Sequence, residues 1–172
     1  MLTKNFYSFV FGKGLKTTIS KSLTTIDGTV TDHAYYYNNN SDQIFTCMSS
    51  FTPSATGSGV MIGTGTTPAT IGDYKLESQL TTGIIFNGTT SVSYNMDDDG
   101  YSMFSTSSVK NNGTEPIAVS EIGLVCNLYN GTSSSSMCKV LLDRTVLDEP
   151  IVINPGETKQ LTYTIRMNYP TA

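Results

Sequence analysis

The sequence predicts an all-β protein, an antiparallel β-sandwich of jelly-roll or immunoglobulin-like type with an N-terminal arm. Of its 172 residues, 46 are Ser or Thr, and β-branched threonine suits a pleated, half-exposed strand better than a helix. Turn signals recur at short intervals through the second half of the chain, as they do in sandwiches. Residues 161–167 also alternate strictly between apolar and polar, which is the pattern of a half-buried strand.

The C-terminal segment gives the clearest local prediction. Asn154-Pro155-Gly156-Glu157 has the residues of a type II turn, because proline fixes φ at about −65° and glycine accepts the positive φ that follows. One face of the next strand is apolar and consists of Leu161, Tyr163, Ile165 and Met167, and the other consists of Thr162, Thr164 and Arg166. We expect residues 151–167 to form a hairpin whose apolar face lies on another sheet.

Three Asn-Gly pairs predict further turns in the second half of the chain. They are Asn87-Gly88, Asn112-Gly113 and Asn130-Gly131. Asn-Gly between apolar segments is the strongest short signal for a β-hairpin. We therefore expect a meander of short strands over residues 83–167.

The first part of the chain carries weaker signals. Asp27-Gly28 predicts a turn, and strands are expected over Thr29–Tyr37 and Gln43–Met48. Residues 1–26 are predicted to be an arm or a first strand, and residues 27–172 are predicted to be the sandwich domain.

One strand register follows from the distribution of charges. If Cys126 lies opposite Cys138, one face of the strand pair is entirely apolar, with the opposed pairs Cys126–Cys138, Leu124–Val140 and Ile122–Leu142. A slip of one residue on the second strand would turn Lys139 and Asp143 inward, so the charges favour the first register. We expect the two cysteines to be buried thiols, because an odd total of three fits a reducing compartment.

Residues suited to catalysis are scarce. His33 is the only histidine, and no nucleophile motif accompanies it. Gly63 and Gly65 lie near a predicted strand end, but Pro68 replaces the last glycine of a dinucleotide-binding motif. The sequence predicts no catalytic residue and no cofactor.

An acidic segment is a weak candidate for a metal site. Asn95, Asp97 and Asp99 precede Gly100, which matches the first half of a calcium-binding loop. The twelfth position is Thr106 instead of the bidentate glutamate of such loops. A solvated acidic turn without metal is the simpler prediction.

Charge and aromatic residues single out the N-terminal segment as a candidate binding arm. Residues 1–26 contain four lysines and no acid, whereas the rest has six basic and fourteen acidic side chains, a net −8. The partner-binding candidates are Lys4, Phe6, Tyr7, Phe9, Phe11, Lys13 and Lys16. We expect this arm to order on a neighbouring subunit, so that a chain beginning at Thr25 would fold but not assemble.

Two classes of partner are not expected. An acidic body repels phosphates, so no nucleic acid is predicted as a partner. No apolar run approaches the roughly 20 residues that a membrane-spanning helix needs, and no secretory signal is recognised.

Several stretches together resemble a β-sandwich module of tailed-bacteriophage virion proteins. They are Val109–Leu124, Leu141–Leu147, Pro150–Ile153, Pro155–Thr158, the opening Asn5-Phe6-Tyr7 and the stretch from Gly63 to Glu77. The resemblance covers most of the chain and implies a structural, non-enzymatic protein, made in the host cytoplasm and incorporated into the virion. It does not distinguish capsid decoration, neck, tail and fibre.

Two functional hypotheses follow from this resemblance and from the residues. In the first, the protein is a virion component that binds the capsid or tail lattice through its sheet surface and N-terminal arm. Its partners would be other virion proteins, with a homo-oligomer or many copies on a symmetric lattice. In the alternative, it is a carbohydrate-binding head-fibre or tail-fibre domain that uses Tyr35-Tyr36-Tyr37 and Asn/Asp loops.

Overall fold

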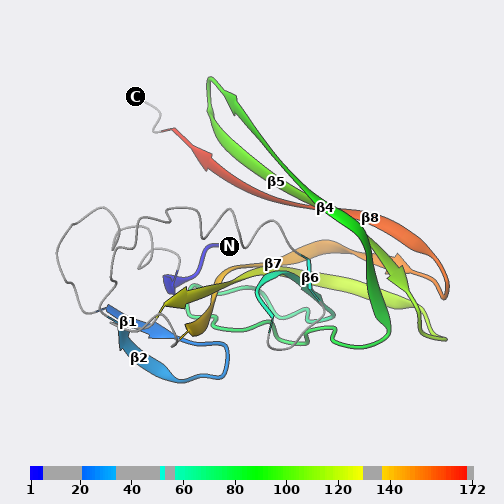
Figure 1. Ribbon diagram of the computed structural model, residues 1–172, viewed down its shortest axis with the longest axis horizontal. Coiled ribbons are helices and arrows are strands. Elements are labelled where there is room, and N and C mark those ends of the chain that lie inside the picture. The colour runs from blue at the N-terminus through cyan, green and yellow to red at the C-terminus, as the bar shows by residue number, and fades with distance from the viewer. Residues whose placement is uncertain (6–20, 34–50, 53–56, 130–136, 170–172) are drawn as a thin grey trace.

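The computed structural model describes residues 1–5, 21–33, 51–52, 57–129 and 137–169, and this part of the chain is built from antiparallel strands (Figure 1). The strands are β1 (Lys21–Thr24), β2 (Val30–His33), β3 (Gly59–Gly63), β4 (Ile84–Asp97), β5 (Gly100–Asn111), β6 (Ile117–Tyr129), β7 (Met137–Ile153) and β8 (Thr158–Asn168). The predicted all-β, antiparallel character is confirmed.

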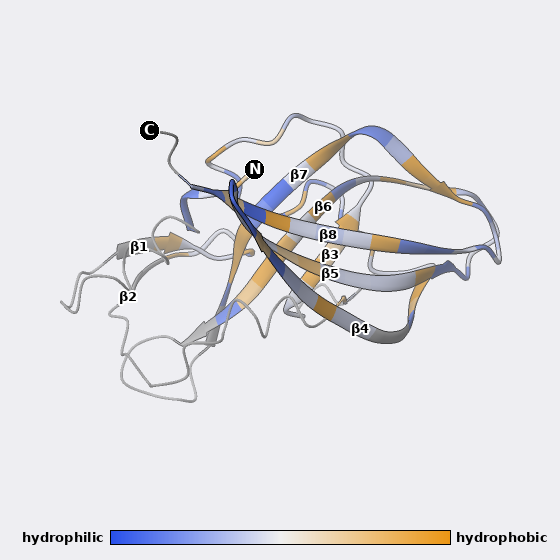
Figure 2. Cartoon of the chain, turned by 90° about the horizontal axis from the view of Figure 1, so that it is seen from above, coloured by the Kyte–Doolittle hydropathy of each residue, from blue (hydrophilic) through white to orange (hydrophobic). Residues whose placement is uncertain are grey.

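Strand pairing divides the described strands into a β1-β2 hairpin and two three-stranded sheets, ordered β3-β6-β7 and β4-β5-β8. The two larger sheets share one hydrophobic core. The buried side chains of this core include Val60, Ile62, Leu124, Cys126, Val140 and Leu142 from one sheet and Met103, Val109, Leu161, Tyr163 and Ile165 from the other. Each buried side chain of this size stabilises the fold by about 1.5–3 kcal/mol. In Figure 2 the apolar positions alternate with polar ones along β8, as a strand with one buried face requires.

The opposite face of the β3-β6-β7 sheet is covered as well. Met61, Leu76, Val125 and Leu141 form a second, smaller cluster there. Leu76 belongs to the connection between β3 and β4, residues 64–83, which crosses this face. β6 is therefore buried on both sides, which explains why its sequence from Ile122 to Cys126 contains no exposed residue.

The predicted C-terminal turn is confirmed, but the predicted hairpin is wrong. The Glu157 N–H donates to the Asn154 carbonyl at 2.9 Å, and Gly156 has a φ of 75°. The strands on either side of the turn belong to different sheets, so the turn carries the chain across the core.

The alternation of β8 is confirmed over most of its length. Leu161, Tyr163 and Ile165 are buried, while Thr162 and Thr164 are exposed. Met167, which was expected to be buried, is exposed because β8 continues beyond the core.

The predicted β6-β7 register is wrong by two residues near the loop. Cys126 pairs with Val140, and Cys138 pairs with Leu128. The apolar face was assigned correctly, because a shift of two residues preserves facing. A bulge beside Leu124 then changes the facing of β7, so Leu142 contributes to the core and Asp143, one residue later, accepts a hydrogen bond from the buried Tyr163.

Two of the three Asn-Gly pairs do not form the expected hairpins. Asn87-Gly88 lies inside β4 at an irregularity between Asn87 and Ser91. Asn112-Gly113 lies in the passage from β5 to β6, which belong to different sheets. Asn130-Gly131 is outside the described residues, between the paired strands β6 and β7.

Near the N-terminus the Asp27-Gly28 turn is confirmed, since it joins β1 to β2 with a φ of 87° at Gly28. Of the strand expected over Thr29–Tyr37, residues Val30–His33 form β2 and the remainder is outside the described residues. The strand expected over Gln43–Met48 is also outside them.

Candidate functional site

An ion pair lies buried beside the β3-β6-β7 sheet. Glu121 of β6 has no exposed surface and Arg144 of β7 is only 3% exposed. The Arg144 Nε donates to the Glu121 Oε2 at 2.8 Å. These side chains face each other because Arg144 pairs with Gly123, which is two residues from Glu121 on the neighbouring strand.

The connection of residues 64–83 supplies the other partners of this pair. Backbone N–H groups of Gly65, Glu77 and Ser78 donate to the Glu121 carboxylate at 3.2, 3.1 and 2.7 Å. Arg144 donates to Asp73 at 2.8 Å and to the Thr67 carbonyl at 3.1 Å. We call these residues the clamp; they are Thr67, Asp73, Glu77, Glu121 and Arg144.

The electrostatics of the clamp favour charged side chains. Burial alone would lower the pKa of Arg144, but its hydrogen bonds to Asp73 and Glu121 outweigh this and raise the pKa. Burial would likewise raise the pKa of Asp73, but hydrogen bonds from the Thr70 backbone and from Arg144 lower it. Both Glu121 oxygens already accept two hydrogen bonds each. The clamp therefore fixes a long connection on the sheet and offers no acid or base for catalysis.

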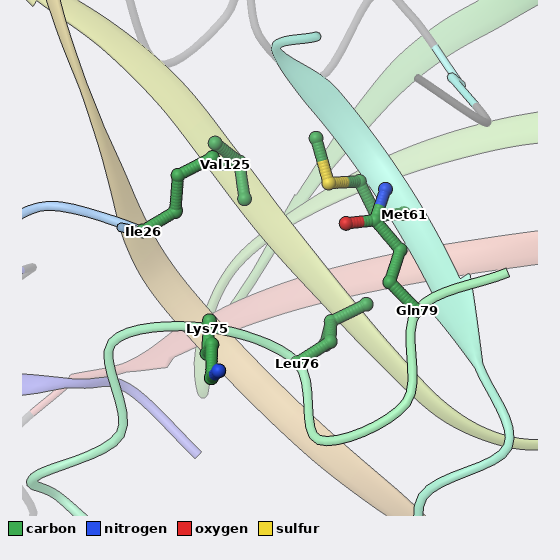
Figure 3. A pocket seen from close by; sticks show the side chains of 6 residues that line it. All are labelled: Ile26, Met61, Lys75, Leu76, Gln79 and Val125. Atoms are coloured by element: carbon green, nitrogen blue, oxygen red, sulfur yellow. The ribbon is translucent and has the colours of Figure 1, made fainter. Parts of the chain in front are cut away.

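A shallow pocket lies near the clamp but does not include it. Its apolar lining consists of Ile26, Met61, Leu76 and Val125, and Lys75 and Gln79 supply polar groups (Figure 3). Its volume of ≈ 160 Å³ is below the roughly 300–1,000 Å³ of typical ligand pockets. We do not assign it a ligand.

The calcium-loop candidates lie at the turn between β4 and β5. The Asp97 carboxylate accepts the backbone N–H groups of Asp99 and Gly100 at 3.0 and 2.9 Å. It also forms a two-pronged pair with Arg166 of β8 at 3.0 and 2.9 Å. The Arg166 hydrogen bonds lower the pKa of Asp97 to about 2. A guanidinium thus neutralises the carboxylate that was a candidate metal ligand, and Asn95 is an exposed residue of β4.

Of the predicted arm residues, only Lys4 is among the described residues, and its side chain is exposed. Its neighbours Thr3 and Asn5 are buried. The Thr3 hydroxyl donates to the Leu141 carbonyl at 2.6 Å, so residues 1–5 lie on the protein's own β7. The candidates Phe6, Tyr7, Phe9, Phe11, Lys13 and Lys16 are outside the described residues, as is Tyr35-Tyr36-Tyr37.

The inner face of the β4-β5-β8 sheet continues beyond the shared core. Met103 of β5 lies in the core, and Tyr94 of β4 is paired with it. Directly opposed residues of antiparallel strands lie on the same face. Tyr94 is nevertheless 73% exposed and Met96 is 71% exposed. Figure 1 shows the reason, since this end of the sheet diverges from β6 and β7.

We call this surface the tip face; its exposed residues are Val92, Tyr94 and Met96 of β4 and Met167 of β8, and the partly buried Tyr101 of β5 lies among them. The Tyr94 and Tyr101 rings stack, with centroids 6.3 Å apart. Sequence reasoning missed this surface although a signal was present. Val92, Tyr94 and Met96 alternate with serines and an asparagine, which predicts one apolar face but not what lies against it.

Within the described ranges, no group of three or more His, Cys, Asp and Glu side chains is placed to hold a metal ion. The described residues also contain no helix of the length and apolar character needed to cross a membrane. Comparison with known proteins finds no match to a family model, a curated protein or a solved structure.

Proposed function

We propose that this chain is a non-enzymatic structural protein, a β-sandwich that binds neighbouring subunits of a symmetric assembly. The virion of a tailed bacteriophage is the assembly to which the sequence resemblance points, with the capsid or tail lattice as the binding partner. The tip face carries this proposal, because contiguous exposed apolar surface on a soluble domain marks an interaction site.

The composition of the tip face supports a protein partner. Aromatic residues and methionine are enriched in protein interfaces, and charged residues are depleted from their centres. Tyr94, Tyr101, Met96 and Met167 fit this composition. The carbohydrate-binding alternative has less support, because Tyr94 is surrounded on this face by apolar side chains instead of the polar groups that orient a sugar.

The clamp supports a structural function in a second way. It holds the connection of residues 64–83 on the sheet through a buried ion pair and backbone hydrogen bonds. A connection fixed in this way presents a constant surface, as a lattice subunit requires. The contribution of an N-terminal arm stays a prediction from the sequence.

The experiment is quantitative mass spectrometry of purified phage particles assembled with the wild-type or a variant chain. We expect the wild-type protein in fixed copy number per particle. Tyr94→Asp should reduce its incorporation at least tenfold, because a charge on the tip face opposes burial. Thr164→Asp is the matched control, since Thr164 is exposed on the other face of the same sheet, and it should be incorporated normally. Particles without the protein, or equal incorporation of both variants, would contradict the proposal.

A further inference from the structure

Among the described residues of the two larger sheets, β4 presents an unprotected sheet edge. β4 is an outer strand of its sheet, and no described residue pairs with its free side. From Ile84 to Met96 it contains no charged residue and no proline. Natural proteins use charges, proline, bulges or covering segments to block edges, because a free edge accepts another strand. β4 has an irregularity between Asn87 and Ser91, so its regular open edge is residues 91–96.

The other edges of the two larger sheets are each protected. β3 is short and is bridged by Phe51 on one residue and by Gln79 on another. Residues 1–5 cover β7 around Leu142 and Arg144 through backbone hydrogen bonds, and β7 carries charges and a proline farther along, at Asp148-Glu149-Pro150. β8 carries Lys159 and Arg166. The contrast indicates that the β4 edge is kept open for a partner strand.

The turn between β4 and β5 determines which backbone groups of β4 point outward. Asp97 pairs with Gly100 across a two-residue turn, and a turn of this kind closes on a hydrogen-bonded pair. Bonded and non-bonded pairs then alternate along the strands. Ser93 therefore bonds to β5, whereas the N–H and C=O groups of Val92 and Tyr94 point to the free edge.

A second copy of the chain fits this edge. With a two-fold axis at Ser93, Val92 of one copy lies opposite Tyr94 of the other, and the outward groups of both residues find partners. Pairs of an aromatic and a β-branched residue stabilise neighbouring strands. The acidic turn at residues 97–99 would lie beyond the paired segments, next to the part of β4 that precedes Ser91 in the other copy, and this part carries no charge. The two tip faces would become one continuous apolar surface.

We infer that β4 pairs antiparallel with β4 of a second copy about a two-fold axis at Ser93, forming a six-stranded sheet. The inference deepens the proposed function and rests on it, because the dimer would be the unit that binds the lattice. Closed two-fold dimers are the commonest homo-oligomers, and their interfaces are self-complementary. Strand addition at a free edge is an established mode of recognition.

The test uses the full chain with a cysteine at the axis. In Ser93→Cys the two new thiols would face each other in a non-bonded pair, with Cβ atoms about 4.5–5.5 Å apart, and mild oxidation should link most of the protein into a dimer. Ser91→Cys is the matched control, because it places the same thiol on the same face but opposite Asn95 of the other copy. Peptide mass spectrometry identifies the linked positions.

A second variant separates dimerisation from folding. Val92→Pro removes an outward N–H that β5 does not use, and proline is tolerated on an edge strand for this reason. We expect at least a tenfold weaker dimer in analytical ultracentrifugation at an unchanged melting temperature. A wild-type chain that is monomeric at about 100 μM, where a Kd of about 1 μM gives mostly dimer, would overturn the inference. Equal cross-linking of Ser93→Cys and Ser91→Cys, or a dimer that survives Val92→Pro, would also overturn it. If the chain were monomeric and its β4 edge bound an unrelated uncharged peptide, the partner strand would not be a second copy.

The two proposals fail separately. A monomeric protein that is nevertheless present in virions removes the β4 pairing and leaves the structural function. A dimer that is absent from virions removes the proposed assembly and leaves the pairing.

Discussion

At the scale of single residues, the buried pair of Glu121 and Arg144 has the largest consequences. Taking two charges out of water costs several kcal/mol for each ion, so a buried pair adds little net stability compared with apolar side chains. Its effect is specificity: only one position of residues 64–83 gives both ions their hydrogen bonds. We interpret the clamp as a device that selects this position.

Removing one member of the pair should therefore be costly. Arg144→Met leaves the Glu121 carboxylate buried without its cation, and we expect the free energy of unfolding to fall by about 3–5 kcal/mol in urea denaturation. The control is Lys159→Met, which breaks a solvent-accessible pair with Glu157 at 3.6 Å and should cost far less than Arg144→Met, because water screens such pairs. The double variant Glu121→Gln/Arg144→Met should lose less than the two single variants together. Similar small losses for Arg144→Met and Lys159→Met would contradict this account.

Asp97 gives a prediction about pH. Its folded pKa is about 2, lowered from 3.8 chiefly by the Arg166 hydrogen bonds. A lowered carboxyl pKa contributes stability above pH 3.8, and this stability is lost as the pH falls from 3.8 to about 2. In Arg166→Gln the pKa of Asp97 should rise towards 3.8, as measured by carboxyl NMR titration. The pKa of Asp27 is the control, because hydrogen bonds from Thr25 and Thr29 lower it, and it should be the same in both proteins. If the pKa of Asp97 did not change in Arg166→Gln, the hydrogen bonds from the Asp99 and Gly100 backbone N–H groups would be sufficient to lower it.

At the scale of elements, two glycines let the connection of residues 64–83 approach the sheet. A Cβ at Gly63 would lie 2.5 Å from the Ser78 carbonyl oxygen, and a Cβ at Gly65 would lie 2.7 Å from the Glu121 Oε1. Neither approach leaves room for a methyl group. These glycines resemble part of a phosphate-binding motif in sequence, but in the structure their absent side chains make room for Glu121.

Gly65→Ala should therefore loosen the clamp. The methyl group would separate Glu121 from the Gly65 N–H, and we expect a loss of about 1–3 kcal/mol in the free energy of unfolding. Gly72→Ala is the control within the same connection, because a Cβ there would meet only the Thr70 hydroxyl at 3.8 Å. If the two variants melted at the same temperature, close packing at Gly65 would not hold the connection.

The elements also show which features the sequence could predict. The facing of β8 and the turn at Asn154 to Glu157 follow from local alternation and turn chemistry, so both were predicted. The β6-β7 register was not, because a shift of two residues keeps every side chain on its face and the residue pattern cannot distinguish the two registers. The bulge at Leu142 and Asp143 is likewise not visible in the pattern. The clamp joins Asp73 to Arg144, which are 71 residues apart in the chain. Glu121 is the one charged residue of β6, but Arg144 is one of five charged residues in β7, so the sequence does not single out this pair.

At the scale of the whole molecule, the described N-terminal residues pack on the two larger sheets and their core. Residues 1–5 cover the edge of β7, and the Thr3 N–H donates to the Leu142 carbonyl at 2.9 Å. Leu23 of β1 is fully buried in the main core. The described part of residues 1–26 thus contacts the protein's own body, whereas the sequence led us to expect contact with a neighbouring subunit.

This placement changes the result expected for a shortened chain. A chain beginning at Thr25 loses the Leu23 side chain, and loss of one buried leucine side chain costs about 2–5 kcal/mol. It also exposes the β7 edge and leaves the carbonyls of Leu141 and Leu142 without the Thr3 hydroxyl. We therefore expect the shortened chain to unfold at a much lower temperature or to aggregate, as judged by circular dichroism and light scattering. Lys4→Ala in the full chain tests the charge alone and should leave the melting temperature unchanged, because Lys4 is exposed. A shortened chain as stable as the full chain would show that residues 1–24 are an arm that the rest of the protein does not need for folding.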